Sequence, residues 1–301
     1  MGVALLAVAT TAPAQELGWS GSLGYASGSY IFAEQFRIVS LLNTLSLRAG
    51  RLELSASLPV YASNGTAVSY IAGVAVPTGG PDAGAVQRRQ GGQTVSVRPG
   101  RRGQGNRMGG NSDILLATTI ADTAADSVSV AGTGSYEVNV GDPMFGGTLT
   151  AYEGRGAVRS LGFDAYAKAP VASIASGVGS GAWDYGAGAS LALGAGETLV
   201  FANAAWWVLG DMPDLELQDA LFYSLAVGHP LGSNWSMLAS ASASTRIIAG
   251  SDPPASVYLT FSRRLSDGAS LSVGAGAGVT ETASAFSASL GWTTRLLGGR
   301  Q

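Results

Sequence analysis

Hydrophobic residues occupy every second position over much of this chain, and the pattern is clearest at residues 183–208. Successive side chains of a strand point to opposite faces, so such alternation predicts a strand with one apolar face and one small or polar face. A short Gly-rich turn at 194–197 joins two arms and predicts a β-hairpin. Each arm of about 11 residues is long enough to cross a bilayer as a tilted strand. In the first arm, one parity carries Trp183, Tyr185, Ala187, Ala189, Leu191 and Leu193, and the other carries Asp184, Gly186, Gly188 and Ser190.

The alternation recurs along the chain and predicts an all-β fold, a transmembrane antiparallel up-and-down β-barrel of about 12 strands. The predicted strands lie at 17–25, 35–48, 51–60, 144–152, 158–169, 183–193, 198–208, 221–227, 235–248, 256–262, 271–279 and 286–293. Segments 68–76 and 127–140 are expected to extend neighbouring strands or to form a small hairpin. Fourteen strands are therefore the alternative, and both numbers are even, as bacterial single-chain barrels require.

The connections between the predicted strands alternate in length, which supports the barrel independently of the face pattern. Short turns fall near 49, 155, 195, 231 and 267, whereas longer connections fall at 28–34, 62–140, 170–182, 209–217 and 249–255, and the one at 280–284 is short too. This arrangement predicts periplasmic turns, outer loops, and both termini in the periplasm. The six Trp residues lie near predicted strand ends or the termini, where aromatic girdles belong.

Composition narrows the fold class further. Gly contributes 44 of 301 residues, charged residues make up only 12%, and the mean hydropathy is positive. No run of 18 continuous apolar residues occurs, so no transmembrane helix is predicted. In lipid only helices and closed barrels satisfy the backbone, so this composition favours a barrel. The alternative, a soluble β-sandwich, would carry more surface charge.

Residues 1–14 resemble a secretory signal peptide, which predicts export to a bacterial outer membrane. Residues 3–8 form a short apolar core, and Ala12-Pro13-Ala14 is a cleavage-type sequence of small residues. The alternative is a disordered apolar N-terminus. We expect the barrel itself to occupy residues 15–301.

The long connection at 62–140 is rich in Gly and Arg and breaks the alternation. In a cytosolic protein such a run would suggest RNA binding by a disordered segment. In an exported barrel it predicts an extracellular loop that faces lipopolysaccharide phosphates, a loop folded into the lumen, or a solvated insertion without a site. The candidate anion-binding residues are Arg88, Arg89, Arg98, Arg101, Arg102 and Arg107.

A set of short motifs resembles an outer-membrane family, the MetA-pathway-of-phenol-degradation family. The motifs are Gly141-Asp142-Pro143, Lys168-Ala169-Pro170, and the Gly-rich run 179–185 that contains Asp184. They match the family's Gly-Asp before a strand, its Lys-x-Pro at a strand end, and its Gly-rich loop closing on an Asp. Two departures are Val171-Ala172 in place of Thr-Gly, and a C-terminus without a terminal aromatic, the usual barrel-assembly signal.

The resemblance covers roughly residues 36–61 and 139–293, and it implies an outer-membrane channel for aromatic or other hydrophobic compounds. Together with the barrel pattern, it leads us to expect passive diffusion of small molecules and no enzymatic activity. Expected partners are outer-membrane lipid, lipopolysaccharide, the barrel-assembly machinery and a small hydrophobic solute, but no nucleic acid, since the net charge is −3. The parity of the strands selects lumen candidates, which are Arg51, Glu53, Asp164, Tyr166, Lys168, Asp184, Asn203, Arg246 and Tyr258.

Three alternatives remain open from the sequence. The lumen candidates can form a salt-bridged interior without a ligand, or the barrel can act as a structural or adhesive protein through its outer loops. A hydrolase barrel is the third, but a Ser–His pair needs a histidine base. The single histidine, His229, falls in a predicted periplasmic turn. With one His, no Cys and scattered carboxylates, neither a metal site nor a cofactor is predicted.

Overall fold

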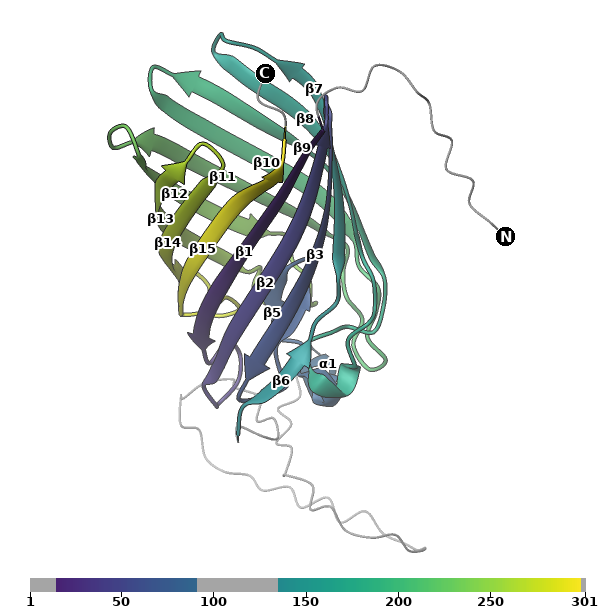
Figure 1. Cartoon of the computed structure of the whole chain (residues 1–301). Coiled ribbons are helices and arrows are strands. Elements are labelled where there is room, and N and C mark those ends of the chain that lie inside the picture. Colours follow the sequence, from purple (N-terminus) through teal and green to yellow (C-terminus); the bar gives the residue numbers. More distant parts are fainter. Residues whose placement is uncertain (1–14, 91–134, 299–301) are drawn as a thin grey trace, which may run out of the picture.

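The computed structural model describes residues 15–90 and 135–298, except for the side chains of 88–90, and it shows a closed antiparallel β-barrel of 12 strands (Figure 1). The barrel strands are β1 (Gln15–Gly28), β2 (Phe36–Ala49), β3 (Leu52–Ser63), β7 (Met144–Glu153), β8 (Val158–Lys168), β9 (Asp184–Ala195), β10 (Thr198–Val208), β11 (Ala220–Pro230), β12 (Trp235–Ser244), β13 (Ala255–Ser266), β14 (Ala269–Gly278) and β15 (Phe286–Leu297). Neighbours in sequence pair with each other, and β1 pairs with β15 to close the barrel. The predicted fold class and strand number are therefore confirmed.

The fourteen-strand alternative is wrong, because the extra strands do not enter the ring. β4 (Ser69–Ile71) and β5 (Val74–Val76) form a separate two-stranded hairpin, which confirms the expected small hairpin at 68–76. β6 (Glu137–Val140) instead pairs with the last residues of β3, while the first half of β3 pairs with β7. β3 therefore pairs first with β7 and then, at its end, with β6.

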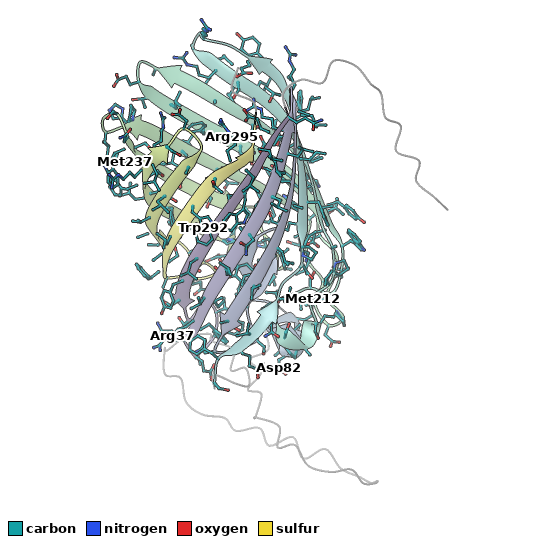
Figure 2. All side chains as sticks on the ribbon, in the orientation of Figure 1. Arg37, Asp82, Met212, Met237, Trp292 and Arg295 are labelled. Atoms are coloured by element: carbon teal, nitrogen blue, oxygen red, sulfur yellow. The ribbon has the colours of Figure 1, made fainter. Side chains whose placement is uncertain are left out.

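The alternation of side chains sorts the barrel into an apolar outside and a small, polar inside. In β8, Phe163 is 55% exposed on the outer face, whereas Asp164 and Lys168 point inward and are buried. Leu225 of β11 is likewise 54% exposed, while its neighbour Ser224 lines the lumen. Figure 2 shows side chains on the outside of the whole barrel, with Trp292 in the middle of one wall and Arg295 nearer one end.

The two ends of the barrel differ in their connections, as the sequence predicted. Short turns join β2 to β3, β7 to β8, β9 to β10, β11 to β12 and β13 to β14, and we call this side the turn end. β1 begins and β15 ends at the turn end, which lies at the top of Figure 1. The opposite side, the loop end, carries the connections between the other neighbouring strands.

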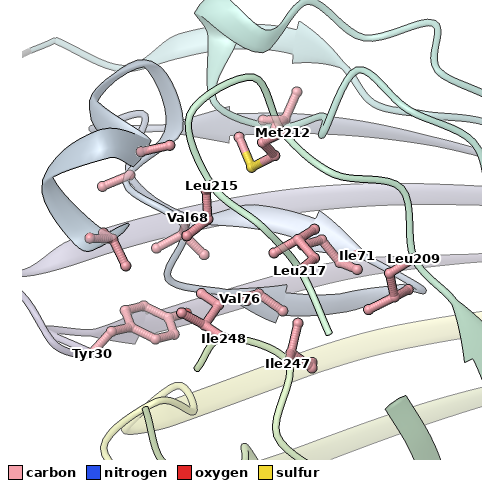
Figure 3. Close-up of a cluster of buried hydrophobic side chains, with 14 of the residues drawn as sticks. Tyr30, Val68, Ile71, Val76, Leu209, Met212, Leu215, Leu217, Ile247 and Ile248 are labelled. Atoms are coloured by element: carbon pink, nitrogen blue, oxygen red, sulfur yellow. The ribbon is translucent and has the colours of Figure 1, made fainter. Parts of the chain in front are cut away.

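A hydrophobic core fills the loop end of the barrel. It is built from the β4–β5 hairpin, the 3-10 turn η1 (Gly80–Asp82), the helix α1 (Ala83–Gln90) and four connecting loops (Figure 3). Its buried members from these segments include Tyr30, Val68, Ile71, Val76, Val86, Met212, Leu215, Leu217, Ile247 and Ile248. No helix in the described ranges is long and apolar enough to cross a membrane.

Candidate functional site

A cavity of about 450 Å³ lies inside the barrel, next to the core of the loop end and on the side of that core that faces the turn end. Its walls come from strands β7, β8, β10 to β13 and β15 and from the loops before β13 and β15. Its ceiling, the surface on the loop-end side, comes from the β4–β5 hairpin. We call it the lumen cavity. Residues that line it with side chains of the inner face include Met144, Tyr166, Asn203, Trp207, Phe222, Ser224, Ser242, Ser244, Ser256 and Ser287.

One wall of the lumen cavity is aromatic. Tyr166 stacks on Trp207 with ring centroids 5.4 Å apart, and Phe222 meets Trp207 edge-on at 6.3 Å. Trp207 is only 4% exposed. Its ring fits because Gly186 faces it, and a Cβ at Gly186 would lie 2.6 Å from the ring. Offset and edge-on aromatic pairs are stable arrangements, so this wall is a rigid apolar surface.

The adjoining wall carries hydroxyl groups. Ser224 of β11 lies directly across from Ser242 of β12, which in turn lies across from Ser256 of β13. The Oγ atoms of Ser242 and Ser256 are 3.1 Å apart. Ser242 and Ser244 of β12 both line the lumen cavity. A solute in the cavity can therefore contact an apolar surface and, next to it, hydrogen-bonding groups.

The ceiling of the cavity is made of small residues. Ala72 and Gly73 form the two-residue turn of the β4–β5 hairpin, and both have positive φ, as in a type I′ turn. These two residues and Val74 and Ala75 face the cavity. Met144 of the barrel wall approaches the tip, since a Cβ at Gly73 would lie 3.6 Å from its sulfur.

The family-type motifs meet in one buried ion cluster at the loop end. Lys168, only 1% exposed, places its Nζ 2.9 Å from Asp184 Oδ2, 3.2 Å from Asp142 Oδ2 and 2.7 Å from Ser180 Oγ. The second oxygen of Asp142 accepts from the backbone N–H groups of Val171 and Ala172. Asp184 Oδ1 accepts in the same way from a third loop. This ion cluster therefore ties three loops to the barrel and does not line the lumen cavity.

Four of the other predicted lumen residues lie on the inner wall of the barrel. Tyr166 and Asn203 line the lumen cavity itself. Asp164 is buried beside them and accepts a hydrogen bond from Thr148 at 2.7 Å. Tyr258 lies flat against the wall, with its hydroxyl donating to Ser289 Oγ at 2.8 Å.

The remaining predicted residues lie near the ends of the barrel. Glu53 lines a second cavity of about 320 Å³ at the turn end, together with Arg48, Arg264 and Arg295. Arg51 sits in the adjacent turn, 3.5 Å from the carbonyl oxygen of Ala151. Arg246 is exposed in the loop after β12, and its Nε donates to the carbonyl of Ser251. The structure does not bring these residues to the lumen cavity.

The predicted signal peptide and most of the Arg-rich segment lie outside the described residues. Arg98, Arg101, Arg102 and Arg107 belong to that part of the chain. Arg88 and Arg89 fall within α1, but their side chains are not described. The anion-binding hypothesis for these six residues stays a prediction.

Several lining residues were not singled out from the sequence. Phe222 and Ser224 share the inward parity of β11, so the face pattern could have identified them once the neighbouring strand was oriented. Met144 opens β7 and faces inward for the same reason. The hairpin tip at 72–75 has no such signal, because its place in the lumen depends on contacts with distant loops.

The single histidine, His229, lies at the turn end of the barrel. Nδ1 of His229 lies 2.9 Å from Thr198 Oγ1 on the exposed turn end, and no serine is hydrogen-bonded to it in the described ranges. Within residues 15–90 and 135–298, no group of three metal-ligating side chains is placed to hold an ion.

Comparison with known proteins supports the fold. No known protein family matches the sequence, and no relative is found among curated proteins. By structure the chain is similar to an outer membrane channel from Pseudomonas putida F1, with a TM-score of 0.58 over 94% of this chain and 96% of that chain at 12% identity. Weaker similarities are to the KdgM porin (TM-score 0.47, 6% identity, 91% and 98% covered) and the CymD monoaromatic hydrocarbon channel (TM-score 0.44, 13% identity, 94% and 89% covered).

Proposed function

We propose that the barrel spans a bacterial outer membrane and acts as a passive channel for small, hydrophobic or aromatic molecules. The single observation that carries this proposal is the lumen cavity, with its aromatic wall of Tyr166, Trp207 and Phe222. The fold shared with an outer membrane channel supports it. So do the motifs that resemble the MetA-pathway-of-phenol-degradation family and that build the ion cluster.

The outer surface has the chemistry that a bilayer requires. Leu54, Phe163 and Leu225 are each about half exposed on different strands. A soluble protein rarely exposes so continuous an apolar surface, whereas a barrel in lipid must. The barrel strands have 10 to 14 residues, which is enough to cross the hydrocarbon core when tilted.

Aromatic side chains lie near both ends of the outer surface, as interfacial girdles do. Trp183, stacked on Tyr185 at 5.8 Å, and Trp206 are about half exposed near the loop end. At the turn end, Trp235 is similarly exposed and lies 5.6 Å from the guanidinium of Arg263. On this proposal the loop end is extracellular and faces lipopolysaccharide, and the turn end is periplasmic.

The inner face carries further apolar side chains between the cavity and the turn end. Phe201 follows Asn203 on the inner face of β10 and is 38% exposed. Leu238 of β12 lies beside it, since both approach the same inner position at Gly228. Tyr258 leaves this face clear because Gly276 lets its ring lie flat, as a Cβ there would be only 2.1 Å from the ring. An apolar solute thus has successive surfaces to contact along one wall.

The cavity volume and lining set the expected solute size. About 450 Å³ is within the range of pockets for small molecules. A one-ring compound can stack on the aromatic wall while a hydroxyl group bonds to Ser224 or Ser242. A charged solute would lose hydration with no counter-charge in the cavity lining to replace it, so neutral solutes are favoured.

Uptake into proteoliposomes that contain the purified barrel tests the proposal. We expect neutral one-ring aromatic compounds to enter faster than their carboxylated analogues and faster than into liposomes without protein. Trp207→Ala, which removes the central ring of the aromatic wall, should alter the ranking of solutes, whereas Trp235→Ala on the outer face should not. Absence of protein-dependent flux for every solute would refute the channel.

A further inference from the structure

The lumen cavity is covered on its extracellular side by one continuous segment, residues 66–87, which we call the plug. It contains the β4–β5 hairpin, η1 and the first part of α1. Its apolar side chains are almost fully buried among loops of the barrel, as Figure 3 shows for Val68, Ile71 and Val76 beside Leu215 and Leu217. The tip of the hairpin is the ceiling of the cavity.

The hydrogen bonds of the plug go to loops and not to the barrel strands. Among the described residues, its hydrogen bonds to the rest of the chain go to the 169–183 loop and to the loop after β10. The backbone N–H of Tyr70 donates to the carbonyl of Val178 at 3.2 Å, and Ser69 Oγ donates to the carbonyl of Gly177 at 2.7 Å. Gln87 Oε1 accepts from the backbone N–H of Glu216 at 3.3 Å.

The contact with the 169–183 loop is a small buried polar network. Ser69 Oγ also lies 2.6 Å from Thr78 Oγ1, and both side chains are fully buried. Thr78 Oγ1 accepts from the backbone N–H of Gly80 at 3.1 Å. Thr78 thus holds the Ser69 hydroxyl in place, and Ser69 joins the plug to the loop through the Gly177 carbonyl. These buried groups are costly to leave unsatisfied. We call Ser69, Thr78 and the Gly177 carbonyl the latch.

The wall contacts of the plug are side-chain packing contacts. Tyr70 stacks face to face on Tyr61 of β3 with centroids 4.1 Å apart, and the hairpin tip meets the flexible side chain of Met144. Neither contact is a backbone hydrogen bond to a barrel strand. The 169–183 loop, by contrast, is fastened to the barrel by the ion cluster through Asp142 and Lys168. The latch thus connects the plug to the 169–183 loop, and the ion cluster connects that loop to the barrel.

We propose that the plug is a gate between the lumen cavity and the extracellular medium, held shut by the latch. The proposal rests on the channel function. Displacement of the hairpin removes the ceiling of the cavity without breaking any strand pairing of the barrel. The small residues of the tip, Ala72 to Ala75, leave room for a solute below it. The closed state is held by apolar burial together with the hydrogen bonds of the latch.

Thiol labelling tests the gate without knowledge of the solute, because the chain has no Cys. Ser224→Cys places one thiol in the cavity, and Asp252→Cys places one in an exposed loop at the same end as a reagent control. A small membrane-impermeant thiol reagent is added to intact cells that lack other porins, so that it reaches the lumen only from outside. The latch variant is Ser69→Ala/Thr78→Val. The matched control is Thr44→Val/Ser57→Ala, which removes a hydroxyl pair 2.8 Å apart on the barrel wall.

We expect the Ser224→Cys thiol to react slowly in the parent and about tenfold faster or more in the latch variant, with no change in the matched control. Equal rates in the latch variant and the parent would overturn the gate. So would a parent thiol at 224 that reacts as fast as the one in Asp252→Cys. A heat-modifiable gel shift confirms that each barrel is folded. If the latch variant does not fold, Asp142→Asn, which weakens the fastening of the loop, takes its place with the same criteria.

Failure of the gate and failure of the channel have different signatures. Ser270→Cys places a thiol in the turn-end cavity. If the latch variant exposes the thiols at both 224 and 270, the gate and a continuous route are both supported. If only the thiol at 224 becomes accessible, the gate stands and the channel is refuted. Fast labelling of both thiols in the parent refutes the gate and leaves the channel intact.

Discussion

Lys168→Met should be one of the most destabilising single changes in the described barrel. Lys168 is the only cation of the ion cluster, and its Nζ lies 2.9 Å from Asp184 and 3.2 Å from Asp142. All three side chains are at least nine-tenths buried. Met fills a similar volume, so the change removes the charge and leaves the packing largely in place.

The magnitude follows from the two carboxylates that stay behind. Removal of one partner from a buried ion pair typically costs about 3–5 kcal/mol, because the remaining charge is buried without compensation. Here two like charges remain, which places the expected loss at the upper part of that range. The triple variant Lys168→Met/Asp142→Asn/Asp184→Asn should lose less, since the amide oxygens can still accept from Val171, Ala172 and Gly210.

Denaturant unfolding of the barrel in lipid vesicles, followed by Trp fluorescence, measures these differences. Arg263→Met is the matched control, because it removes a cation from an exposed site beside Trp235 and should cost about 1 kcal/mol or less. A loss for Lys168→Met that equals that of the control would refute the reasoning. So would a triple variant that is less stable than the single one.

Three further outcomes are expected. Gly276→Ala should push the Tyr258 ring into the lumen, because the added Cβ would lie 2.1 Å from the ring, and solute flux should fall. Gly156→Ala, which has open space around it, is the control. Trp207→Leu should enlarge the lumen cavity and lower the free energy of unfolding by about 3 kcal/mol, measured by denaturant titration. Burial raises the pKa of the Tyr70 phenol well above its ordinary value. The neutral, buried phenol therefore contributes fully to the free energy of unfolding below a pH of about 10. That contribution is lost as the pH rises through the pKa of Tyr70 in the folded state. The plug should therefore loosen only at strongly alkaline pH. Phenolate absorbance and the labelling rate of the Ser224→Cys thiol, both measured against pH, check this. A labelling rate that is already at its maximum at neutral pH would contradict it.

The barrel fold and the direction of its strand side chains could be predicted from the alternation pattern and the turn lengths. Every second residue in β8 and β9 alternates between lipid-compatible and small or polar side chains, and the structure keeps that assignment at Phe163, Asp164 and Asp184. Such a pattern is local, because the direction of a strand side chain depends only on its parity. The order of short and long connections likewise needed no tertiary information.

The candidate site was predictable only in part. Tyr166, Asn203 and the inward direction of Trp207 follow from parity, and all three line the lumen cavity. Lys168 and Asp184 share the inward parity too, but the structure assigns them to the ion cluster. Parity says that a side chain points inward, yet whether it meets solvent, a ligand or an opposite charge depends on loops that cross the barrel end.

The sequence by itself thus determined the class of fold and which face of each strand is apolar, because these depend on the two-residue period and on turn chemistry. It left 12 or 14 as the number of barrel strands, and the structure decided for 12. Only the tertiary structure decided that residues 66–87 fold back into the barrel and cover a cavity. The same structure decided that Asp142, Lys168 and Asp184 come together from three segments. The physical reason is that the plug is held by apolar burial and hydrogen bonds with loops far away in sequence, and no local period records such contacts.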